Sequence, residues 1–115
     1  MYTNESLKKL LKKCTKLQNS LMRTRAACGE AIYDEQNTEE INDVKAYVEY
    51  KIDLLNDISN LIKNFLKGYL NCTIEEMAET LNYYRSQFNA LTKDSYLSRL
   101  QQIYSRQLNE EIKVL

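Results

Sequence analysis

The sequence predicts an all-α antiparallel helical bundle: a long coiled-coil-like hairpin of two helices, each about 33 residues, covered by one kinked or two shorter helices. Composition favours helix, since Pro is absent and Gly occurs twice in 115 residues, 43% of which are hydrophobic. An apolar heptad repeat runs almost unbroken through residues 7–72. Turn residues with capping patterns interrupt that repeat. The length fits a single helical-bundle domain spanning residues 1–115.

The first helix is expected over residues 4–35. Asn4 is a good N-cap, and Glu5 suits the positive end of the helix dipole. Apolar or small residues recur at three- and four-residue spacing and form one seam, made of Leu7, Leu10, Cys14, Leu17, Leu21, Thr24, Cys28 and Ala31. Five lysines fall on the opposite arc of the helix. This pattern predicts a helix with one buried seam and one charged face.

The second helix is expected over residues 38–71, after a turn at 34–38. Asn37 with Glu40 resembles a capping box that opens this helix. Its seam residues are Ile41, Val44, Val48, Lys51, Leu55, Ile58, Ile62, Phe65, Tyr69 and Cys72. Apolar residues also flank the seam on both sides, at Tyr47, Leu54, Leu61, Ile52 and Leu66. So broad an apolar face predicts that a further helix packs on the hairpin.

The third helix is expected over residues 74–91, after a turn at 71–73. Thr73 with Glu76 forms a second capping-box pattern. One apolar stripe follows, made of Ile74, Met77, Leu81, Tyr84, Phe88 and Leu91. This stripe supplies the expected cover for the hairpin.

Beyond Leu91 the apolar stripe changes face. Residues 97–115 carry a new stripe about 180° away around the helix, made of Leu97, Leu100, Tyr104, Leu108 and Leu115. One straight helix cannot bury both stripes against the same hairpin. Either residues 92–95 form a turn and a fourth helix over 95–113 folds back, or the helix continues and offers its second stripe to another subunit.

Charge is balanced overall but segregated along the chain. The 16 Lys and Arg residues equal the 16 Asp and Glu residues, which disfavours a dedicated nucleic-acid binder. Residues 1–28 nevertheless carry seven basic groups against Glu5 alone, and residues 29–60 carry nine acidic groups against Lys45 and Lys51. Complementary blocks on neighbouring helices would fix their pairing and orientation.

The sequence provides little for catalysis or metal binding. His is absent, which removes the commonest general base and transition-metal ligand. Cys14, Cys28 and Cys72 are too scattered for a structural zinc site and do not suggest a disulfide framework. We therefore expect a non-enzymatic protein without a cofactor or metal. No signal peptide or membrane-spanning run is evident, so a cytoplasmic location is expected.

The leading functional hypothesis is a protein–protein interaction module of adaptor, chaperone, immunity or inhibitor type. Its partner would be another protein or a second copy of the chain. Exposed Tyr beside Arg is typical of interfaces, and the second stripe adds apolar surface. The candidate interface residues are Tyr83, Arg85, Tyr96, Leu97, Leu100, Ile103, Tyr104 and Leu108.

The alternative hypothesis is a nucleic-acid-associated regulator. It would use the basic arc of the first helix as an anion-binding face, because clustered lysines contact phosphates. The candidate residues are Lys8, Lys9, Lys12, Lys13 and Lys16. The acidic segment in the same small domain opposes this hypothesis.

Overall fold

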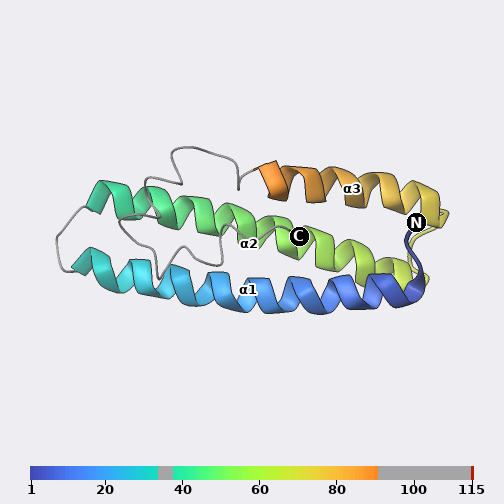
Figure 1. Cartoon of the computed structure of the whole chain (residues 1–115), viewed down its shortest axis with the longest axis horizontal. Helices are drawn as coiled ribbons and strands as arrows, with labels where there is room; N and C mark the ends of the chain where they lie inside the picture. Colours follow the sequence, from blue (N-terminus) through green and yellow to red (C-terminus); the bar gives the residue numbers. More distant parts are fainter. Residues whose placement is uncertain (34–37, 91–114) are drawn as a thin grey trace.

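The computed structural model describes residues 1–33, 38–90 and 115, with side chains for 1–26, 42, 45–90 and 115. Within these described ranges, three helices run up, down and up: α1 (Asn4–Tyr33), α2 (Thr38–Leu66) and α3 (Ile74–Ala90) (Figure 1). The described ranges contain no strand, which confirms an all-α helical bundle. The expected Asn37 cap, the turn at 92–95 and a helix over 95–113 lie outside the described residues.

The predicted seam between α1 and α2 is buried wherever its side chains are described, up to Ile62. Its members leave at most 8% of their surface exposed: Leu7, Leu10, Cys14, Leu17, Leu21 and Thr24 from α1, and Val48, Lys51, Leu55, Ile58 and Ile62 from α2. Residues three and four apart lie on one helical face, so each helix buries a continuous stripe. In the described part of the hairpin, the hydrophobic core therefore runs along the seam, from Leu7 to Thr24 on α1 and from Val48 to Ile62 on α2.

Both hairpin helices are shorter than expected. α1 has 30 residues and α2 has 29, and α2 ends at Leu66 instead of residue 71. α2 ends early because of Gly68, whose φ of 75° lies in the left-handed region. The amide of Gly68 donates to the Phe65 carbonyl and that of Tyr69 to the Asn64 carbonyl, both at 3.0 Å. These bonds form a Schellman motif, which terminates the helix.

The early end of α2 also corrects the expectation for Tyr69. Its side chain was predicted to lie in the seam, but it is 74% exposed. The heptad register alone would place the ring toward α1. Reversal of the chain at Gly68 turns this residue into solvent instead.

Replacing Gly68 by Ala is expected to lower the free energy of unfolding by about 1–2 kcal/mol, because an L residue with a side chain is strained in the left-handed region. No atom lies within 4 Å of the position an added Cβ would occupy, so steric overlap contributes nothing. Urea unfolding followed by circular dichroism measures the loss. Gly68→Asn should cost less, since Asn tolerates this region better, and equal losses would contradict the explanation.

The starts of α1 and α3 carry reciprocal caps. At α3, the amide of Glu76 donates to Thr73 Oγ1 at 3.2 Å and the Thr73 amide donates to Glu76 Oε1 at 3.4 Å, which confirms the predicted capping box. At α1 the cap is Thr3, not Asn4. The Ser6 amide donates to Thr3 Oγ1 at 3.1 Å, and the Thr3 amide donates to Ser6 Oγ at 2.8 Å.

α3 packs on α2 and supplies the cover that the broad face of α2 predicts (Figure 1). Met77, Leu81 and Phe88 of its stripe are buried, while Ile74 and Tyr84 pack against the core from its edge. On α2, the flanking residues Ile52 and Leu54 are also buried. Apolar residues on both flanks of the α2 seam are therefore removed from solvent.

Lys51 is a fully buried member of the α2 seam. Its Nζ lies 4.3 Å from the centroid of the Phe88 ring and 5.3 Å from that of Tyr47. A cation over an aromatic face gains more when it is removed from water. This contact joins α2 to α3 through a charged group in the core.

Cys14 is a buried thiol in the α1 seam. Burial raises its pKa from 9.0 to about 11, although a hydrogen bond with Ser59 opposes the rise. In the unfolded chain the thiol ionises first, so the stability it contributes is complete below pH 9 and is lost as the pH rises toward 11. The loss should be on the order of 2 kcal/mol.

Comparison with Cys14→Ala isolates this effect from the Tyr and Lys residues that titrate in the same range. The difference in unfolding free energy between the two proteins should shrink between pH 8.5 and 11, a range set roughly by the thiol pKa. A constant difference would contradict the prediction. At neutral pH a thiol reagent should modify the half-buried Cys72 well before Cys14.

Candidate protein-interaction site

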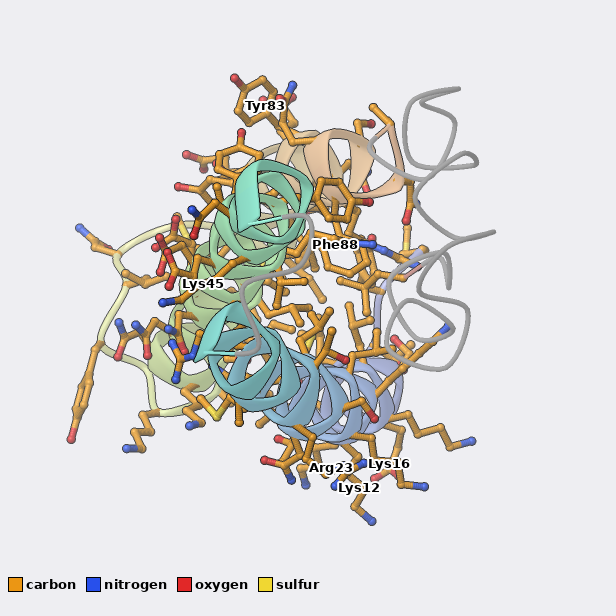
Figure 2. All side chains as sticks on the ribbon, turned by 90° about the vertical axis from the view of Figure 1, so that its left-hand side faces the viewer. Lys12, Lys16, Arg23, Lys45, Tyr83 and Phe88 are labelled. Carbon is orange, nitrogen blue, oxygen red and sulfur yellow. The ribbon has the colours of Figure 1, made fainter. Side chains whose placement is uncertain are left out.

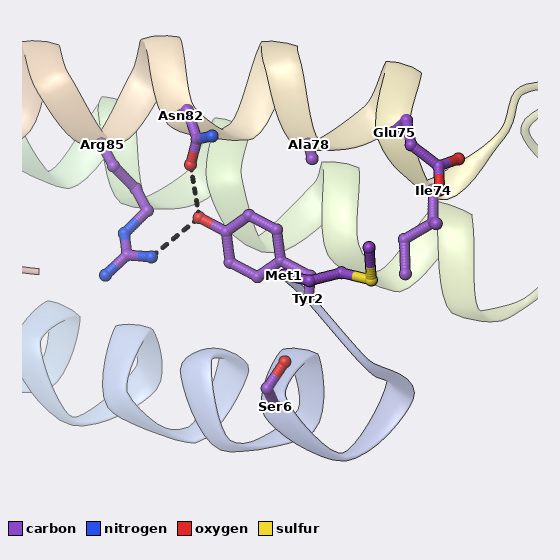
Figure 3. A pocket seen from close by; sticks show the side chains of 8 residues that line it. All are labelled: Met1, Tyr2, Ser6, Ile74, Glu75, Ala78, Asn82 and Arg85. Carbon is purple, nitrogen blue, oxygen red and sulfur yellow. Dashed lines mark hydrogen bonds between the residues drawn. The ribbon is translucent and has the colours of Figure 1, made fainter.

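A cavity of about 470 Å³ lies between the start of α1 and α3 (Figure 3). The N-terminal segment and α1 contribute Met1, Tyr2 and Ser6, and α3 contributes Ile74, Glu75, Ala78, Asn82 and Arg85. The volume falls within the range of small-ligand and side-chain pockets. Because Arg85, Asn82 and the Tyr2 hydroxyl lie at one end and Glu75 at the other, the cavity can orient what enters it (Figure 3).

Arg85 is the centre of these polar groups. Its Nη1 donates to the hydroxyl of Tyr2 at 2.8 Å, and that hydroxyl donates to Asn82 Oδ1 at 2.6 Å (Figure 3). The guanidinium carbon also lies 5.9 Å from the centroid of the Tyr2 ring. Tyr2 thus fixes the half-buried guanidinium with one hydrogen bond and one ring contact.

Two further donors of Arg85 point to Leu115. Nε and Nη2 donate to the main-chain oxygen of Leu115 at 3.1 and 2.8 Å. Asn89 Oδ1 accepts from the Leu115 amide at 2.8 Å. The Leu115 side chain is 3% exposed and joins the hydrophobic core. We call Arg85 and Asn89 the Leu115 clamp.

Helical periodicity explains why one face of α3 builds both features. Ala78, Asn82, Arg85 and Asn89 are spaced by four, three and four residues, so they form one stripe beside the buried stripe of α3. Tyr2 reaches this stripe from the segment preceding α1, where the Thr3–Ser6 cap directs the chain. The cavity and the clamp therefore share Arg85.

Tyr83 and Arg85 were predicted to share one interface, but they lie on different faces of α3. Tyr83 is 61% exposed and points away from the bundle, whereas Arg85 points toward α1 (Figures 2 and 3). Two residues along a helix correspond to about 200° of rotation, which accounts for the separation. The six other predicted interface residues, Tyr96, Leu97, Leu100, Ile103, Tyr104 and Leu108, lie outside the described residues.

All five candidate anion-binding lysines of α1 are exposed. Lys12 and Lys16 project from the side of α1 that faces away from the other helices, the same side as Arg23 (Figure 2). Within the part of the chain that the structure describes, none of the five has an ion-pair partner. The structure therefore brings these lysines together on one solvated face.

Neither a metal site nor a membrane span emerges from the described residues. They contain no group of three or more His, Cys, Asp or Glu side chains placed to hold a metal ion. None of their helices combines the length and the hydropathy that crossing a bilayer requires.

Several site residues were missed at the sequence level. Asn82 and Asn89 could have been found, because with Arg85 they form a polar stripe at helical spacing beside the apolar one. Leu115 was placed in the second apolar stripe, but neither it nor Tyr2 carries a local signal for its polar contacts with α3, which lie 26 or more and 80 or more residues away in sequence. Only the path of the chain brings them to α3.

The fold and the cavity together define a small helical-bundle protein with a preformed polar site between its first and third helices. Comparison of the chain with protein-family models, curated proteins and solved structures finds no match. The function is therefore argued from the chain's own residues.

Proposed function

We propose that this protein is a non-enzymatic interaction module that binds a partner protein through α3 and the Tyr2–Arg85 cavity. The observation that carries the proposal is the exposed ring of Tyr83 on the outward face of α3 (Figure 2). Its ring centroid lies 6.0 Å from that of Tyr84, so an aromatic pair spans from solvent toward the core. Tyr is enriched at binding hot spots because it buries a large area with few rotatable bonds.

The charge of the exposed surface around Tyr83 indicates which partner segments complement it. Exposed Glu76 and Glu79 lie seven and four residues before Tyr83, on the same face of α3, whereas Glu75 lines the cavity. Arg85 does not offset them on the outer face, because its guanidinium is held by Tyr2 and Leu115. A partner segment with Lys or Arg beside an apolar side chain complements this surface.

Site-specific photo-crosslinking in living cells tests the proposal. A benzophenone amino acid at position 83 should yield one discrete protein adduct, identifiable by mass spectrometry. The matched control places the same group at Lys12, which is exposed on α1 and points away from α3 (Figure 2). Identical adducts from both positions, or none from position 83, would overturn the proposal.

Homo-oligomerisation is the alternative within this class of function, through the second apolar stripe. Leu115, the one member of that stripe that the structure describes, is buried within its own chain. This burial supports a monomer of 13.6 kDa in size-exclusion chromatography with light scattering. A dimer would instead assign the stripe to an intersubunit seam.

A nucleic-acid-associated regulator is the second candidate, supported by the five exposed lysines of α1. Replacing Lys9, Lys12 and Lys16 by Gln should lower the salt dependence of oligonucleotide binding by about one unit of slope per phosphate contact removed. Lys63→Gln with Lys67→Gln, at the end of α2, is the matched control. Unchanged affinity after the triple replacement would exclude this function.

A further inference from the structure

The Leu115 clamp recognises a residue by its main chain. The Leu115 amide donates to Asn89 Oδ1 at 2.8 Å, and its main-chain oxygen accepts from Arg85 Nε and Nη2. Asn89 Nδ2 lies 3.4 Å from the same oxygen, so the amide group of Asn89 faces both polar main-chain atoms. A side-chain amide that meets an N–H and a C=O of one residue reads the peptide backbone, whatever the sequence.

The side chain of the bound residue supplies the selectivity. Leu115 is 3% exposed and belongs to the hydrophobic core cluster, so its isobutyl group occupies an apolar site. A charged side chain there would be buried without the water that stabilises it. The clamp and this apolar site together fit a leucine.

The guanidinium of the clamp has a second anchor besides Leu115, in Tyr2. Arg85 Nη1 donates a hydrogen bond to the Tyr2 hydroxyl at 2.8 Å, and Tyr2 is in turn fixed by Asn82 (Figure 3). A guanidinium that another hydrogen bond already holds loses less conformational freedom when it binds an oxygen. The same contacts place the clamp at one end of the cavity, so a segment in the clamp can extend along the cavity.

We propose that the Leu115 clamp is a peptide-binding site for a leucine-bearing extended segment, with Leu115 as its resident ligand in this chain. A partner's leucine would take the place of Leu115 on Arg85 and Asn89, and the neighbouring partner residues would enter the Tyr2–Arg85 cavity. This inference rests on the proposed interaction function and names the chemistry of the partner segment. Because Leu115 is tethered, it competes at a high effective concentration and keeps the site closed to weak ligands.

A peptide titration followed by NMR tests the proposal on the full-length chain. The probe is an acetylated, amidated hexapeptide with the sequence of residues 110–115, and the matched control peptide ends in Asp. The chain carries Leu115→Asp, which disfavours the resident ligand. The leucine peptide should shift the side-chain amide signals of Asn89 in a saturable way, and the Asp peptide should not.

Two comparisons complete the test. The intact chain should bind the leucine peptide about ten-fold or more weakly than the Leu115→Asp chain, because Leu115 occupies the site. Adding Asn89→Ala to the Leu115→Asp chain should abolish the saturable shift that the leucine peptide causes in the Nε–H signal of Arg85, the other member of the clamp. Equal binding to both chains, binding that ignores Asn89, or no binding at millimolar peptide would overturn the proposal.

Hydrogen exchange on the unmodified chain provides a measurement that does not depend on a variant. Excess leucine peptide should accelerate exchange of the Leu115 amide, which is otherwise bonded to Asn89. If the peptide leaves the exchange rate of the Leu115 amide unchanged, Leu115 is not displaced from the clamp.

The clamp and the proposed function can fail separately. If the position-83 adduct forms but the clamp takes no peptide, the partner binds the outer face of α3 alone. If the clamp takes the peptide but position 83 gives no adduct, the peptide site exists and the interaction surface assigned to Tyr83 is wrong.

Discussion

Phe88→Ala is expected to lower the free energy of unfolding by about 4 kcal/mol, the largest single effect on this fold. Phe88 is fully buried and is the largest apolar side chain that α3 contributes to the core (Figure 2). Its removal leaves a cavity at the α2–α3 contact and takes away the ring over which Lys51 Nζ lies at 4.3 Å. Urea unfolding followed by circular dichroism and by tyrosine fluorescence measures the loss.

Phe88→Leu is the matched control. It keeps an apolar side chain in the site but removes the ring. The loss of unfolding free energy should therefore equal the energy of the contact with Lys51 plus no more than about 1.5 kcal/mol. A double-mutant cycle with Lys51→Met isolates the contact between the charge and the ring, with an expected coupling of about 1–2 kcal/mol. Additive losses would show that Lys51 packs against Phe88 without a specific interaction.

Arg85→Met is expected to lower the free energy of unfolding by about 2–3 kcal/mol, because two hydrogen bonds to Leu115 and one to Tyr2 disappear together. Met fills much of the space of the aliphatic stem but donates no hydrogen bond. Of the clamp, Leu115 then keeps only its contacts with Asn89 on α3. Denaturant unfolding and exchange of the Leu115 amide should report the change together.

Arg23→Met is the control for this prediction. Arg23 is exposed on α1, where its Nη2 donates a local hydrogen bond to Ser20 Oγ at 3.1 Å. Its replacement should change stability by no more than about 0.5 kcal/mol. Equal losses for the two variants would mean that Arg85 contributes only general surface charge.

The helices and most of the core followed from local information. Leu7, Leu21, Leu55 and Ile62 recur at helical spacing, and the structure buries each of them completely. The flanking apolar residues of α2 predicted a third helix on the hairpin, and α3 fills that position. These features are set by periodicity, which a sequence carries in segments of a few turns.

The end of α2 shows how a local signal can be misread. The heptad register continued through Tyr69, and Gly68 was not recognised as a helix terminator. The structure ends the helix at Leu66, because the left-handed conformation of Gly68 closes a Schellman motif. Helix termination depends on the conformation of one residue, and an apolar repeat does not report it.

The sequence by itself determined the three helices, their buried stripes and the solvated lysine face, because each depends on residues only a few positions apart. The tertiary structure alone decided the candidate site. Tyr2 lies 83 positions before Arg85, and Leu115 lies 30 positions after it, yet all three meet on one face of α3. No local pattern encodes that meeting, since it depends on the direction in which each connection returns the chain.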